Sequence, residues 1–258
     1  HIATSESALV DAIEQFDSAN IDDLVIDLRY NGGGFLDIAN QLAYMIAGSA
    51  QASGRIFEEL QFNDKNTTHD PITGNPLTPT RFKTTTQGFS TTAGQSLPTL
   101  GLPRVFLLTT GSTCSASEAI INGLRGIDVE VIQIGETTCG KPFGFYPQDN
   151  CGTTYFTVQF QVQNAKGFGE YGDGFSPESV SSETRLPGCV ASDDFDNALG
   201  NTNERLLSMA LTYRDTGTCS TSLTKPQGIA QKPLFRPSQQ TSLVRPRSLQ
   251  NALKTPRQ

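Results

Sequence analysis

The chain has 258 residues, of which 36% are hydrophobic and 17% are charged, so it carries enough apolar side chains for a folded core. No apolar run approaches the ~20 residues that a membrane-spanning helix needs, and the composition therefore argues against a transmembrane or a fully disordered protein. The net charge is −7, but residues 217–258 hold seven basic side chains and no acidic one. The remaining 12 basic and 26 acidic side chains form an acidic body, which argues against a nucleic-acid enzyme.

The cysteines and histidines bear on compartment and on metal binding. The sequence has five cysteines without a C-x-x-C pair and only two histidines, His1 and His69, so it predicts neither a metal site nor a cofactor. Five cysteines are many for a reducing cytosol. They favour an extracytoplasmic chain, whether periplasmic, secreted or envelope-associated, with one or two disulfides.

The first third of the chain predicts a helix, a strand, a glycine turn and a second helix. Apolar positions at helical spacing follow Ser5, a suitable N-cap, and continue to about Asn20. Residues 24–28 are short and apolar, as in a strand buried on both faces. The turn Asn31-Gly32-Gly33-Gly34 leads into a second helical pattern over residues 36–46. Residues 63–103 are rich in threonine and proline and predict loops with short edge strands.

The strand-turn-helix pattern then resumes. Residues 105–108 predict a buried strand, residues 115–126 a helix, and residues 129–134 another strand. Repeated units of this kind predict a layered α/β domain, with ligands at the turns that follow the strands. The period changes to two over residues 156–163, which predicts a half-exposed strand, and a last helix is predicted over residues 194–214. We expect a core over residues 1–216 and a basic, proline-rich tail over residues 217–258.

Two residues could act together as nucleophile and base. Ser115-Ala116-Ser117-Glu118 opens a predicted helix, and S-x-x-E is the capping-box pattern, which usually does nothing else. The same position also places a hydroxyl beside free backbone N–H groups that could stabilise an oxyanion. The sequence has no G-x-S-x-G turn, and neither histidine is well placed to act as the base. Lys141, in a glycine-flanked turn after a predicted strand, could replace histidine if burial lowers its pKa, although a lone loop lysine is more often a surface residue.

The glycine turn is the third element. It could cradle a phosphate, but G-x-G-x-x-G and a Walker lysine are absent. Glycine could instead let a backbone N–H approach a substrate carbonyl closely. The sequence therefore leaves both uses of the turn open, with nucleotide binding the weaker one.

In combination these segments resemble the C-terminal processing, or tail-specific, serine peptidases. The resemblance rests on residues 27–34, 112–126 and 135–141, with Gly174-Phe175-Ser176-Pro177-Glu178 as a further match, and covers roughly residues 20–190. It implies the layered, spiral α/β core shared with crotonases and Clp-type proteases, here with a β-rich insertion. It also implies that this core starts after the family's first strand and that no PDZ domain lies in the sequence, so an N-terminal PDZ or helical domain is expected in the full-length protein.

The resemblance implies a role for each matching residue. Ser115 would be the nucleophile and Lys141 the general base, the N–H groups of Ala116 and Gly34 would form the oxyanion hole, and Glu118 would help to orient the site. The substrates would be protein C-terminal or unstructured segments, cleaved through an acyl-enzyme. Phe145 stands where many relatives have glutamine, and Pro142 replaces a common glycine.

Other interpretations stay open. A non-catalytic peptide- or lipid-binding module could use the same fold, and a crotonase-type acyl-thioester enzyme is a third reading, although no coenzyme-binding loop is visible. For the cysteines we expect bridges Cys139–Cys151 and Cys189–Cys219, a hypothesis because connectivity does not follow from sequence. A further hypothesis is that the C-terminus at Gln258 occupies the substrate groove as an inhibitor. The sequence indicates no oligomeric state.

Overall fold

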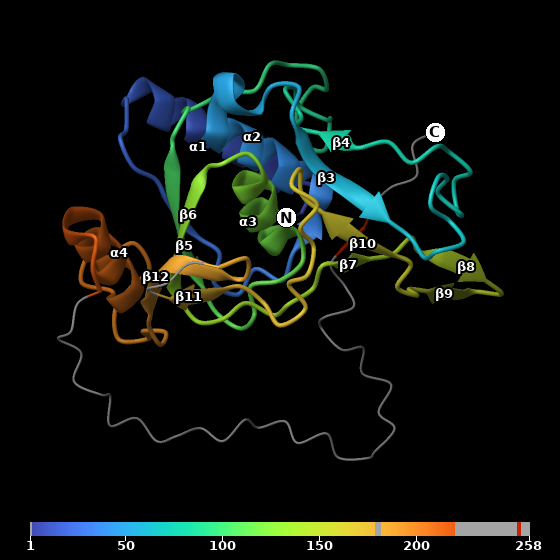
Figure 1. Ribbon diagram of the computed structural model, residues 1–258. Coiled ribbons are helices and arrows are strands. Elements are labelled where there is room, and N and C mark those ends of the chain that lie inside the picture. Colours follow the sequence, from blue (N-terminus) through green and yellow to red (C-terminus); the bar gives the residue numbers. More distant parts are fainter. Residues whose placement is uncertain (1, 179–181, 220–251, 254–258) are drawn as a thin grey trace, which may run out of the picture.

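The computed structural model describes residues 2–178, 182–219 and 252–253, and a five-stranded parallel sheet lies at its centre (Figure 1). Each neighbouring pair in the sheet is parallel, with Ile26 opposite Leu107 and Val105 opposite Val131. The strand order is β1 (Val25–Asp27), β5 (Arg104–Thr109), β6 (Glu130–Gly135), β12 (Arg185–Val190) and β11 (Ser176–Glu178).

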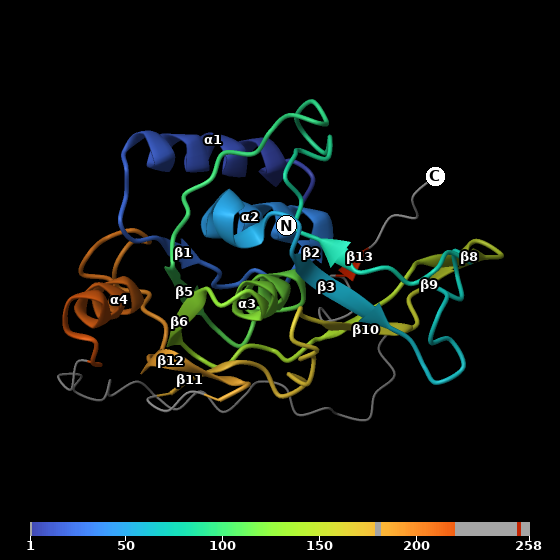
Figure 2. The ribbon, with the colours of Figure 1, turned by 45° about the horizontal axis from the view of Figure 1, so that its top comes forward.

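Helices cover both faces of this sheet (Figures 1 and 2). On one face lie α2 (Leu36–Ala52) and α3 (Ala116–Gly126), and on the other lies α4 (Arg205–Thr216). Side chains of β5 alternate between the two layers: Val105 and Leu107 join the α2–α3 core, whereas Phe106 and Leu108 join the α4 core. The remaining helix, α1 (Ser5–Ser18), packs against α2. The predicted layered α/β fold is confirmed.

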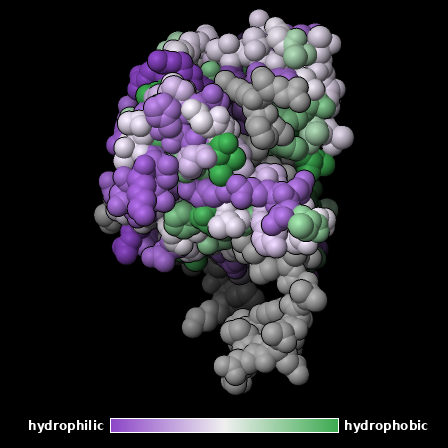
Figure 3. Space-filling model, turned by 90° about the vertical axis from the view of Figure 1, so that its right-hand side faces the viewer, coloured by the Kyte–Doolittle hydropathy of each residue, from purple (hydrophilic) through white to green (hydrophobic). Residues whose placement is uncertain are grey.

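A second, antiparallel sheet extends to one side of the core. It consists of β4 (Thr80–Arg81), β3 (Ile56–Gln61), β10 (Phe160–Gln163) and β7 (Phe143–Gly144), in that order, and the hairpin β8 (Gln148–Asn150)–β9 (Thr153–Tyr155) lies beyond it. Figure 3 views this side, on which hydrophilic residues predominate. A short pair is formed by β2 (Gly34–Phe35) and β13 (Ala252–Leu253). The long threonine-rich segment contributes only β4 and isolated bridges, as its composition predicts.

Four element predictions need correction. The first strand, β1, is half-buried because it lies at the edge of its sheet. Thr4, not Ser5, is the N-cap of α1. The period-two segment is a strand only over β10, because only its last four residues lie in the ladder with β3 and β7. The last helix begins at Arg205, because the Glu204 carboxylate caps it by accepting from the amides of Leu206 and Leu207.

A buried ion cluster fixes the turn that follows β1. The Arg29 side chain is 1% exposed and donates to Asp27 at 2.7 Å, to Glu204 at 2.8 Å and to Asp193 at 3.0 Å. The hydrogen bond to Asp27 is the main reason that the pKa of Arg29 is raised. The Tyr30 hydroxyl also donates to Asp193. Arg29 thus ties the start of the glycine turn to the N-terminus of α4.

None of the described helices is both long and apolar enough to cross a membrane.

Candidate active site

Ser115 lies on a tight turn between β5 and α3. Its φ of +58° falls in the left-handed region, which few residues other than glycine adopt. Two hydrogen bonds fix this turn to the segment that follows β1. Thr113 Oγ1 donates to the Leu28 carbonyl at 2.8 Å, and the Cys114 amide donates to the Asn31 carbonyl at 3.1 Å. A serine on a strained strand-to-helix turn is a recurrent arrangement for a nucleophile. Here the side chain sits at the N-terminus of α3, beside the amide of Ala116.

The glycine turn after β1 packs directly against the serine turn. A Cβ added to Gly33, whose φ is +105°, would lie 2.8 Å from Ser115 Cβ and 3.0 Å from the Ala116 nitrogen. The Gly33 amide donates to Asn31 Oδ1 at 3.0 Å. The next residue, Gly34, begins β2. Only a chain without a side chain at position 33 can bring this turn so close to Ser115.

We expect Gly33→Ala to slow acylation of Ser115 by about 10²-fold, because the added methyl must displace the serine turn and small misplacements carry such costs. Acylation rates with a serine-directed probe measure the effect. Gly54→Ala is the matched control, since Gly54 has φ of +73° but no atom within 4 Å of an added Cβ. A Gly33→Ala protein that is acylated at the control's rate would contradict this account of the turn.

The Glu118 carboxylate connects the serine to the lysine loop. Its side chain is fully buried, and Oε2 accepts from the amides of Ser115 at 2.9 Å and Lys141 at 2.8 Å. Oε1 accepts from Thr138 Oγ1 at 2.6 Å and from the Gly140 amide at 2.8 Å. Burial raises the pKa of Glu118, and these hydrogen bonds oppose the rise. The capping box that the sequence predicts is present, and it also holds the loop that carries Lys141.

Lys141 is partly buried and lies beside an aromatic ring. Its Nζ lies 5.1 Å from the centroid of Phe145, which is fully buried, and has no hydrogen-bond partner among the residues the structure describes. Burial lowers the pKa of Lys141, and the nearby charge of Glu118 opposes this. The face of the Phe145 ring attracts an ammonium group, so the lowered pKa of Lys141 comes from its burial and not from the ring.

A disulfide joins the two turns, and it corrects one prediction. Cys114 is bonded to Cys139, with Cα atoms 5.2 Å apart, whereas Cys151 is a free, exposed thiol in the β8–β9 hairpin. The expected Cys139–Cys151 bridge is therefore wrong, because the Cys139 amide donates to the Thr113 carbonyl and draws this residue to the serine turn. The expected Cys189–Cys219 bridge is present. Cys114, Glu118 and Cys139 cluster like metal ligands, but both sulfurs are in the disulfide.

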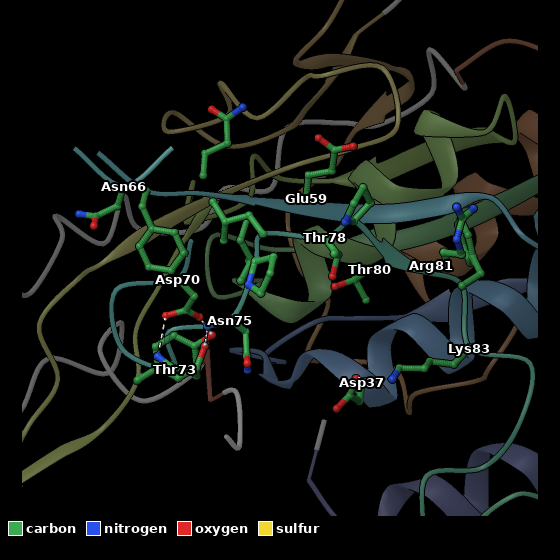
Figure 4. A pocket seen from close by; sticks show the side chains of 18 of the residues that line it. Asp37, Glu59, Asn66, Asp70, Thr73, Asn75, Thr78, Thr80, Arg81 and Lys83 are labelled. Atoms are coloured by element: carbon green, nitrogen blue, oxygen red, sulfur yellow. Dashed lines mark hydrogen bonds and ion pairs between the residues drawn. The ribbon is translucent and has the colours of Figure 1, made fainter. Parts of the chain in front are cut away.

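A cavity of about 910 Å³ lies away from these residues, between α2 and the loops around β4 (Figure 4). Neither Ser115 nor Lys141 lines it. Charged side chains stand in its walls: Asp37, Glu59, Asp70, Arg81 and Lys83. The Asp70 carboxylate accepts hydrogen bonds from the Tyr146 hydroxyl and from the amide of Thr73, and Lys83 forms an ion pair with Asp37. Walls of this kind do not suit a lipid, which is one of the two ligands, peptide or lipid, of the alternative interpretation.

The structure brings Ser115, Ala116, Glu118 and the Lys141 loop together, as the sequence predicts. It adds Gly33, Thr138 and the Cys114–Cys139 bridge, which are not among the predicted site residues. A signal for Gly33 was present in the run of three glycines. Cys114 and Cys139 stand next to the predicted nucleophile and two residues before the predicted base, which was a signal for their bridge.

The parallel sheet with helices on both faces is consistent with the fold of a peptidase family. The chain belongs to peptidase family S41, whose family model matches residues 2–146 and so includes both turns. No curated protein sequence matches the chain.

Three solved structures are similar to parts of the chain. A candidate S41 protease from Bacteroides fragilis NCTC 9343 has a TM-score of 0.64 and 28% identity, over 82% of this chain and 49% of that one. The photosystem II D1 C-terminal processing protease has a TM-score of 0.49 and 18% identity, over 70% of this chain and 39% of that one. A lipoprotein from Streptococcus agalactiae has a TM-score of 0.47 and 13% identity, over 70% of this chain and 57% of that one. The chain spans about half the length of the Bacteroides protein.

Proposed function

We propose that this chain is a serine endopeptidase in which Ser115 is the nucleophile and Lys141 the general base, acting on C-terminal or unstructured segments of proteins. The observation that carries the proposal is the Glu118 Oε2 atom, which accepts from the amides of both residues and so holds their turns together. The lowered pKa of Lys141 supports it, because a base must be neutral to accept a proton. Two disulfides support an extracytoplasmic location.

The reaction would proceed in two steps. Ser115 Oγ attacks the substrate carbonyl carbon, its proton passes to Lys141 Nζ, and the amides of Ala116 and Gly34 stabilise the oxyanion. Lys141 then donates this proton to the leaving amine as the C–N bond breaks, which leaves an acyl-enzyme. Water, deprotonated by Lys141, attacks the ester, and the proton returns to Ser115. Glu118 takes no proton in this scheme and acts as a positioning residue.

A serine-directed phosphonylating probe tests the proposal. We expect the label on Ser115, and we expect its rate to rise with pH through a midpoint below 10.5, the ordinary lysine pKa, because the neutral amine forms above the lowered pKa of Lys141. Mass spectrometry locates the label, and Ser115→Ala should take none. Ser117→Ala is the matched control, since Ser117 is a buried serine on the same turn of α3. Label on another residue, or no label on folded protein at any pH, would refute the proposal.

A further inference from the structure

The end of the chain returns to the candidate active site. The backbone of β13 pairs in parallel with β2, with Ala252 opposite Gly34 and Leu253 opposite Phe35. It also contacts β7, which begins two residues after Lys141. A strand from the C-terminal segment thus pairs with the strand of the predicted oxyanion-hole glycine (Figure 2) and contacts the strand that follows the predicted base.

This is the position in which a peptidase needs its substrate. A peptide that is to be cleaved must lie extended along the oxyanion hole, and strand addition supplies main-chain hydrogen bonds with little demand on sequence. Among the described residues, β2 pairs with no strand other than β13, so its edge is open to an added strand once β13 leaves.

We propose that β2 is the peptide-binding edge of the enzyme and that the chain's own segment around Ala252–Leu253 occupies it as a built-in competitive ligand. The inference rests on the proposed function and names how that site takes a peptide. The segment that docks is residues 252–253 and not the C-terminal Gln258 of the sequence-based hypothesis, which lies outside the described residues.

Charge and tethering both favour this occupant. The segment from residue 217 to 258 carries seven basic and no acidic side chains, and the rest of the chain has a large excess of acid. Tethering places a segment near its site at an effective concentration of the order of millimolar. A tethered strand therefore outcompetes a free peptide even when each backbone pairing is weak.

Peptide binding tests the proposal without relying on catalysis. All proteins carry Ser115→Ala, and the probe is a fluorescent peptide of residues 247–258. One protein has the parental tail, and one has Ala252→Pro and Leu253→Pro, which remove both backbone donors of β13. The matched control has Thr241→Pro and Ser242→Pro, in the same tail but outside the strand. Thermal melts verify that all three are equally folded.

We expect the peptide to bind the β13 proline variant at least tenfold more tightly than the parent or the control, because only there is the β2 edge vacated. Equal affinity for all three proteins, including binding to none, would overturn the proposal. The same three tails are also made in proteins that keep Ser115, and the phosphonylating probe is applied to them. This second measurement separates a failure of the docked strand from a failure of the proposed function. If peptide binding depended on the tail but Ser115 took no label, the docked strand would be supported and the proposed peptidase activity refuted. If Ser115 took the label but peptide binding did not depend on the tail, the peptidase activity would be supported and the docked strand refuted.

Discussion

Replacing Lys141 with methionine is expected to slow acylation of Ser115 by about 10²- to 10⁴-fold, the usual contribution of a general base. Methionine keeps an unbranched side chain beside Phe145 but cannot accept a proton. The backbone amide of residue 141, which donates to Glu118, is retained, so the loop should keep its place. The rate is measured with the phosphonylating probe across pH, and the rise with pH should disappear along with the activity.

The matched control is Lys166→Met. Lys166 is exposed, and its ammonium pairs with Asp128 on the surface, so its loss should leave both the rate and the pH profile unchanged. Thermal melts of the two variants separate a loss of base from a loss of fold. If Lys141→Met kept a rate within threefold of the parent with an unchanged profile, another group would be the base.

Arg29→Met is expected to lower the free energy of unfolding by about 3–5 kcal/mol, because it leaves buried carboxylates without their counter-charge. Glu204 is fully buried beside Arg29, and Asp193 is mostly buried, so neither can recover full hydration. The same change frees the start of the glycine turn from α4. Urea denaturation measures the loss of stability, and acylation of Ser115 under native conditions should fall with it.

Arg185→Met is the control, because Arg185 and Glu178 form a solvent-exposed pair. Exposed pairs contribute about 0–1 kcal/mol, so this variant should unfold close to the parent. A second change, Glu204→Gln in the Arg29→Met protein, removes the most buried of the uncompensated charges while keeping an oxygen that can cap α4. It should recover part of the lost stability. Equal stabilities for Arg29→Met and Arg185→Met would show that the cluster does not hold the turn.

Local sequence determined most of the fold. The apolar run at 105–108 fixes β5, because a strand with both faces covered needs side chains that are apolar on both sides. Residues 129–134, which are apolar except for Glu130 and Gln133, likewise indicate β6. The capping pattern at Ser115 and Glu118 fixes the start of α3. The order of turn motifs also placed Ser115 and Lys141 as candidates, since consecutive parallel strands end at one edge of the sheet.

Only the tertiary structure decided which partners meet across that edge. Glu118 serves as more than a helix cap because the Lys141 loop, brought in after β6, supplies two further amides to the same carboxylate. Cys139 pairs with Cys114 instead of the nearer Cys151 because the fold, and not distance along the chain, sets which sulfurs approach. The position of β13 on β2 is likewise a contact between the two ends of the sequence. Such contacts depend on packing between segments that lie far apart in the sequence, and the local pattern of one segment does not indicate which other segment it will contact.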